Sequence, residues 1–70
     1  MAIEFEVQRL QMGDVILVDL PEHGGEVEAK VVRSIDRTDT TVRAVLRVGR
    51  GEDFVREWPI GERVTVVRGP

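Results

Sequence analysis

The segment from Thr40 to Val48 constrains the fold more than any other part of the chain. One set of its alternate positions is wholly apolar and comprises Val42, Ala44, Leu46 and Val48. The other set comprises Thr41, Arg43, Val45 and Arg47. Successive side chains of a strand point to opposite faces, so this period of two predicts an antiparallel strand with one buried face. We expect it to be the central strand of the fold, with the other segments as its partners.

The apolar composition favours an all-β domain. The 70 residues include 13 valines and four isoleucines but only four leucines and three alanines. β-branched side chains suit a pleated sheet and lose rotamer freedom in a helix. A chain of this length forms one domain that buries roughly 60% of its unfolded surface. We therefore predict a single domain over residues 1–70, a small antiparallel barrel of five or six strands, with no disulfide because cysteine is absent.

Five further segments have the composition of strands, and glycine and proline mark the turns between them. The third of these segments loses its alternation near Val31–Arg33, which indicates a bulge or a sharp bend. The predicted strands are Ile3–Val7, Val15–Leu20, Glu26–Asp36, Glu52–Trp58 and Arg63–Arg68.

The inward positions of these strands define the expected core. In Glu52–Trp58 the facing is ambiguous, because Phe54, Arg56 and Trp58 share one parity. Trp58 either closes the core or lies exposed at the barrel end, and the core is favoured because a lone tryptophan in so small a domain is usually buried. The predicted shared core is Val27, Val31, Ile35, Val42, Ala44, Leu46, Val64 and Val66.

Three segments carry a resemblance to a known family: Gly13–Val18, Glu28–Val32 and Ile60–Val67. They supply a first strand led by Gly-Asp, part of a long bent second strand, and a final strand rich in valine. This order, over residues 12–68, resembles the SH3-like barrels of the Tudor and KOW kind and implies that fold. His23-Gly24 is similar to a loop of the Tudor-like RNA-polymerase-binding domain of the CarD type. The chain departs from Tudor domains in having no tyrosine and three aromatic residues in all, which argues against methyl-lysine recognition.

Residue types suited to catalysis are sparse. The only imidazole, His23, lies in a predicted loop, and Ser34 is a polar position of a bent strand. A nucleophile needs an adjacent base, which neither residue is expected to have. Acidic side chains from Asp19 to Glu28 match no known metal-binding loop and are expected to be hydrated. We predict no enzyme activity, no catalytic residue, no metal site and no cofactor.

The chain also lacks membrane signals. No run approaches the roughly 20 apolar residues of a membrane span, and Met1–Gln11 has early glutamates where a signal peptide has an apolar core. The absence of cysteine is typical of a reducing compartment. We expect a cytoplasmic protein without membrane contact.

Charge is distributed unevenly along the chain. Residues 1–28 hold seven acidic residues and one basic residue, net −6, whereas residues 29–70 hold six and nine, net +3. Nine of the ten bases are arginine, which contacts carboxylates and phosphates through a planar pair of donors. The candidate binding surface is the outer face of the Thr40–Val48 strand, formed by Arg43, Val45 and Arg47 and flanked by Arg33.

Several uses of this arginine face are open. A basic rim around an apolar centre is a common interface arrangement, so we predict docking of an acidic protein partner. Nucleic-acid contact through the same face is the alternative, which the net charge of −3 and the pI near 5.0 disfavour. The face also fits a solvated surface with cross-strand ion pairs, or one in which Ile3–Val7 or the C-terminal tail covers Val45.

Overall fold

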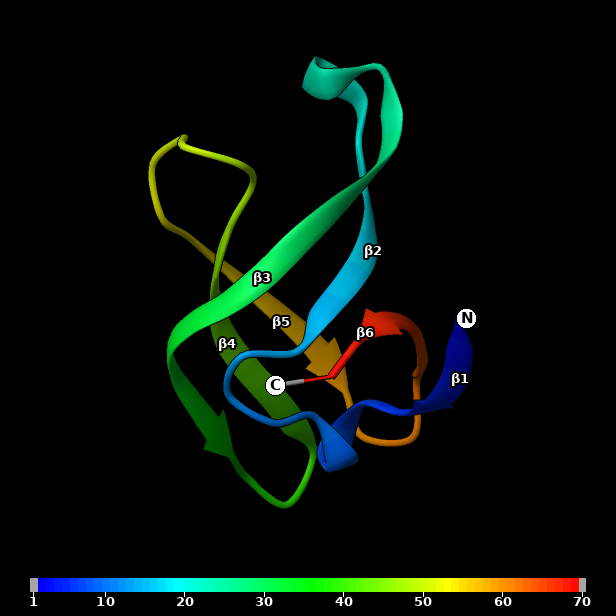
Figure 1. The fold of residues 1–70 in the computed structure, drawn as a ribbon. Helices are drawn as coiled ribbons and strands as arrows, with labels where there is room; N and C mark the ends of the chain where they lie inside the picture. Colours follow the sequence, from blue (N-terminus) through cyan, green and yellow to red (C-terminus); the bar gives the residue numbers. More distant parts are fainter. Residues whose placement is uncertain (1, 70) are drawn as a thin grey trace.

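The computed structural model describes residues 2–69 and contains one antiparallel sheet of six strands (Figure 1). The strands lie in the order β1-β6-β2-β3-β4-β5. Two single 3₁₀ turns, η1 (Val7–Arg9) and η2 (Pro21–His23), flank β2. The predicted all-β antiparallel fold is confirmed. The strands are β1 (Ile3–Glu6), β2 (Val15–Leu20), β3 (Gly25–Arg37), β4 (Thr41–Arg47), β5 (Phe54–Pro59) and β6 (Arg63–Arg68).

Strand β3 is long enough to pair with a different neighbour along each of its halves. Its first half, from Gly25 to Lys30, pairs with β2, and its second half, from Lys30 to Arg37, pairs with β4. The β3–β4 register shifts between Val31 and Ile35, which confirms the predicted bulge or bend. A bulge bends its strand and increases the local twist. The β2–β3 hairpin, with η2 at its tip, therefore projects away from β4 (Figure 1).

The sheet curls without closing, which is the departure from the predicted barrel. A closed barrel needs hydrogen bonds between its first and last strands, but within residues 2–69 no ladder joins β1 to β5. β1 has only four residues because the chain enters η1 at Val7, after one last bond of the β1–β6 register from the Val7 amide to the Glu62 carbonyl at 2.8 Å. β5 ends at Pro59, which has no N–H to offer to a further strand on the side away from β4. Two strand edges consequently stay open.

The apolar core lies inside the curl of the sheet. Leu46 and Val42 of β4 are 0% exposed, which confirms the predicted facing of this strand. Trp58 lies opposite Val42 on β5 and is 4% exposed, so it belongs to the core as predicted. Val27 and Ile35 are only partly buried and pack against the core from its margin. The other predicted core residues are buried: Val31, Ala44, Val64 and Val66.

The core also contains residues outside the predicted set. Val7 and Leu10 are 0% exposed although η1 and its C-cap carry them. A 3₁₀ turn has three residues per turn, so positions three apart lie on the same side. β2 contributes the buried residues Ile16, Val18 and Leu20.

Strand β4 is paired on both sides, with β3 and β5. The expectation that it would be the central strand is wrong, because β4 lies one strand from the edge while β2 and β3 are the middle pair. Only β5 therefore separates β4 from an open edge of the sheet. The solvent-facing side chains of β4, which were predicted to bind a partner, lie beside those of this edge strand.

Candidate protein-docking face

The outer side of β4 carries three of the residues predicted for binding. Arg43 is exposed, and Val45 and Arg47 are half-buried. Arg33, the fourth predicted residue, is exposed in the bulge of β3. We use the name β4–β5 face for the surface formed by Arg33, Arg43, Val45, Arg47, Asp53, Val55 and Glu57.

Asp53 joins two of the predicted arginines. Its Oδ2 atom accepts a hydrogen bond from Nε of Arg33 at 2.6 Å, and its Oδ1 atom accepts one from Nε of Arg47 at 2.7 Å. The carboxylate precedes β5 and its side chain is 19% exposed. Arg33 lies 20 residues away in sequence, so the bend of β3 and the β4–β5 turn together form this cluster.

Arg43 is paired across the same two strands. It lies opposite Glu57, with 3.4 Å between Nη2 and Oε2 and with both side chains about half exposed. An ion pair so exposed contributes about 0–1 kcal/mol to stability. The β4–β5 face therefore holds three arginines and two carboxylates, net +1. It is less basic than the arginine pattern alone indicates.

The two guanidinium groups change the acidity of Asp53. Hydrogen bonds from Arg47 first, and then from Arg33, hold the pKa of the Asp53 carboxyl below its ordinary value of 3.8. A folded-state pKa below the unfolded one means that the group stabilises the fold above the unfolded value. That stabilisation is lost as the pH falls through the lowered folded-state pKa.

We expect Asp53→Asn to flatten the acid end of the stability profile. The wild-type protein should lose the Asp53 contribution as the pH falls below about 4, whereas the amide has no proton to bind there. Urea unfolding at about pH 7 and about pH 2 measures this difference. Asp39→Asn is the control, because Asp39 is exposed and makes no ion pair with any residue of 2–69. Equal pH dependence in the two variants would contradict the prediction.

The centre of the β4–β5 face is apolar. Val45 and Val55 lie directly opposite each other, and Val55 is 60% exposed. The Arg43–Glu57 pair lies on one side of the two valines and the Asp53 cluster on the other. Residues 3–7 do not cover Val45, because they form β1 and the start of η1 beside β6. Of the predicted C-terminal tail, Gly69 follows Arg68, which lies opposite Val15 on β2, and Pro70 lies outside the described residues. The valines are therefore open to a partner.

The free backbone groups of edge strand β5 follow from its register. The Ile60 amide donates to the Thr40 carbonyl at 2.8 Å, and hydrogen-bonded and non-hydrogen-bonded pairs alternate along an antiparallel ladder. Counting back from Ile60, Val55 and Glu57 fall on non-hydrogen-bonded pairs, so their N–H and C=O groups face away from β4. Pro59 occupies the same kind of position, where the ladder needs no N–H. Such an edge can accept an extended segment as an added strand.

Sequence reasoning missed three residues of this face: Asp53, Val55 and Glu57. The available signal was the period of two in Glu52–Trp58, whose facing was ambiguous. Burial of Trp58 fixes that facing, because Phe54 and Trp58 then point inward and Val55 and Glu57 outward.

Other candidate chemistry is dispersed in the structure. His23 in η2 and Ser34 in β3 are both exposed. Across residues 2–69 no three His, Cys, Asp or Glu side chains are grouped so that they could hold a metal ion. The same part of the chain has no helix that is long and apolar enough to cross a membrane.

Comparison with known proteins gave no match: no protein-family model fits the chain, and no curated protein or solved structure is significantly similar. The geometry of the β4–β5 face is therefore the basis for assigning a function.

Proposed function

We propose that this chain is a non-enzymatic binding module that docks a protein partner on the β4–β5 face. The observation that carries the proposal is the 60% exposure of Val55, which lies opposite half-buried Val45 on an open strand edge. Protein interfaces combine an apolar centre with a polar rim, and strand edges recruit extended segments. Arg33, Arg43 and Arg47 form the rim. The β4–β5 face as a whole, with Asp53 and Glu57 included, has a net charge of +1, which suits an acidic partner.

The charge of the face favours a protein over a nucleic acid. Binding of phosphates derives its strength from cations that neutralise them, whereas Asp53 and Glu57 already pair with the arginines of the face. The chain as a whole carries −3, which opposes the approach of a polyanion. We also propose that the protein is located in the cytoplasm. As its structural relatives we propose the SH3-like barrels of the Tudor and KOW kind.

Replacing Val55 by aspartate tests the proposal. We expect Val55→Asp to weaken binding of the partner about tenfold or more, because it puts an unpaired charge at the centre of the interface. The partner is identified by affinity capture and mass spectrometry from cells that express the protein, and its affinity is then measured by titration. The fold should survive, since Val55 is 60% exposed.

Ile3→Asp is the matched control for Val55→Asp. Ile3 is 59% exposed and lies on β1, the other edge strand, so the substitution adds the same charge at the same exposure outside the face. Unchanged affinity in Val55→Asp would refute the proposal, and equal losses in the two variants would show general apolar adsorption. Reversing Arg43 is a poorer test, because a glutamate there would lie opposite Glu57.

A further inference from the structure

A second surface lies over the outer side of β3, where β6, β2, β3 and β4 are neighbours in the sheet. Two shallow hollows of about 580 Å³ and about 680 Å³ meet there and share Lys30, Val32 and Arg47. We use the name β2–β3 groove for the surface formed by Val15, Glu28, Lys30, Val32, Arg47 and Arg68.

The register of the sheet explains why basic side chains gather in this groove. Lys30 lies opposite Val15 on one side and opposite Arg47 on the other. Val15 in turn lies opposite Arg68 of β6. Because neighbouring strands are about 4.8 Å apart, three cations from three strands occupy one row, with Val15 between Arg68 and Lys30.

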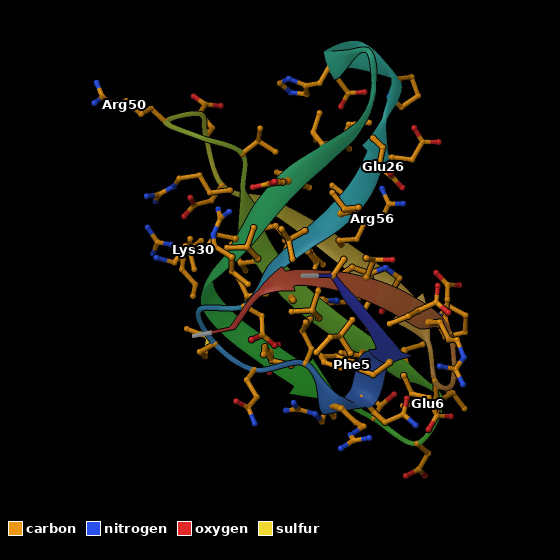
Figure 2. The ribbon with its side chains drawn as sticks, turned by 45° about the vertical axis from the view of Figure 1, so that its right-hand side comes forward. Phe5, Glu6, Glu26, Lys30, Arg50 and Arg56 are labelled. Atoms are coloured by element: carbon orange, nitrogen blue, oxygen red, sulfur yellow. The ribbon has the colours of Figure 1, made fainter. Side chains whose placement is uncertain are left out.

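Only part of this positive charge is neutralised. Arg68 pairs with Glu28 at 3.1 Å and Arg47 with Asp53 at 2.7 Å. Lys30 is exposed and makes no ion pair with any carboxylate of residues 2–69. It projects outward, on the side of the molecule away from Glu6 (Figure 2). Among the charged residues that line the two hollows, one is acidic, Glu28, and four are basic: Lys30, Arg33, Arg47 and Arg68.

The floor of the groove is apolar. Val15 is 8% exposed, although its lining of the groove places it on the outer side of β2. Val32 is half-buried beside it. Long basic side chains cover apolar surface with their stems and keep their charges in water. The groove therefore combines an apolar floor with cationic walls, which suits a side chain that has both methylenes and a negative charge.

We infer that the β2–β3 groove binds an extended acidic segment of the protein partner. Glutamate carboxylates contact Lys30 and its neighbouring arginines, while the glutamate methylenes pack over Val15 and Val32. Alternate side chains of an extended segment are about 7 Å apart. Successive cations of the row are one or two strands apart, about 5 to 10 Å, so carboxylates on alternate residues can contact successive cations. The inference rests on the proposed function, because the groove meets the β4–β5 face at Arg47 and one partner can contact both.

The charges favour a carboxylate segment over a nucleic acid strand. A nucleic acid presents a phosphate at every nucleotide and needs several free cations, whereas Lys30 is the one member of the cationic row without a carboxylate partner among residues 2–69. A segment with a few carboxylates on methylene stems also gains contact with the valines.

Titration of the folded chain with a blocked hexaglutamate peptide tests the inference, with chemical shifts followed by NMR at about 0.1 M salt, where the Debye length is about 10 Å. We expect Lys30→Glu to weaken binding about fivefold to tenfold, because an attraction becomes a repulsion inside the groove. Arg63→Glu changes the net charge equally but lies five residues before Arg68 on β6, about 16 Å along the strand. It should weaken binding less than about twofold.

Each result of this titration either supports or overturns the inference. Equal losses in Lys30→Glu and Arg63→Glu would show a net-charge effect and overturn it, as would the absence of peptide binding. Tighter binding of a single-stranded deoxythymidine hexamer than of hexaglutamate would overturn it in favour of a phosphate site. The neutral pair Lys30→Gln and Arg63→Gln repeats the comparison if either reversal unfolds the chain. Val55→Asp should leave hexaglutamate binding within about twofold, so failure of the β4–β5 face and failure of the groove are distinguishable.

Discussion

Replacing Leu46 by alanine is expected to lower the free energy of unfolding by about 2–5 kcal/mol. Leu46 is 0% exposed and lies between Val31 on β3 and Phe54 on β5, so its removal leaves a cavity that paired strands on both sides prevent from collapsing. A domain of 70 residues has a total stability of about 4–10 kcal/mol. Urea unfolding measures the loss through the fluorescence of Trp58, the only tryptophan in the chain.

Leu17→Ala is the matched control for this deletion. Leu17 is half-buried on β2, next to two buried residues, Ile16 and Val18. The substitution removes the same atoms from the opposite face of the sheet, so it should cost clearly less than the substitution of Leu46. If Leu46→Ala leaves the unfolding midpoint at the wild-type value, the facing of β4 is incorrect.

The strands and their facing could be predicted because the relevant signals are local. β2 and β6 begin and end at the predicted residues, Val15–Leu20 and Arg63–Arg68, since turn residues flank an apolar or alternating run in each case. The alternation in β4 predicts its buried side correctly. The loss of alternation near Val31–Arg33 predicts the register shift that bends β3.

The openness of the sheet depends on information that is not local. Whether β1 meets β5 is decided by strand lengths and by the partner that each strand finds, and a period of two specifies neither. Val7 shows the same limit. The alternation assigns it to a strand, and its amide continues the β1–β6 register by donating to the Glu62 carbonyl, but the chain enters η1 at this residue.

The ion pairs of the surface also could not be predicted from the sequence. Arg33 and Asp53 are 20 residues apart in sequence, and Glu28 and Arg68 are 40 apart. Each pair forms only because the sheet order brings its strands together. A composition rich in arginine therefore predicts basic residues on the sheet. Only the register shows that carboxylates neutralise most of the β4–β5 face, while Lys30 has no carboxylate partner within the described part of the chain.

The Arg47–Asp53 pair connects the two proposed surfaces. Arg47 belongs to the β4–β5 face through Asp53 and lines the β2–β3 groove beside Lys30. A carboxylate of the bound protein that approaches Lys30 also comes within reach of Arg47. The hydrogen bond to Asp53 holds the Arg47 guanidinium in place. The sheet thus has exposed valines at its edge and a row of basic side chains over β3, and Arg47 belongs to both.

Replacing Trp58 by alanine is expected to be the most destabilising single change, at about 3–5 kcal/mol. Trp58 is 4% exposed and packs in the core opposite Val42. Large aromatic side chains bury about 150–250 Å² each, and the other buried core residues are valines, alanines, leucines and isoleucine, none of which is large enough to fill the space. The loss is about half or more of the total stability of a domain of this size, so the variant should have a clearly lower unfolding midpoint in urea than the wild-type protein.

Trp58→Phe separates the loss of volume from the loss of the aromatic ring. Phenylalanine keeps a ring in the core, so this variant should stay folded and lose about 0.5–3 kcal/mol. Far-UV circular dichroism must follow unfolding in both variants, because each removes the only tryptophan. If Trp58→Ala unfolds at the same urea concentration as Trp58→Phe, the indole does not support the core. The exposed positions of Val55 and Glu57, which follow from its inward facing, would then need to be reassigned.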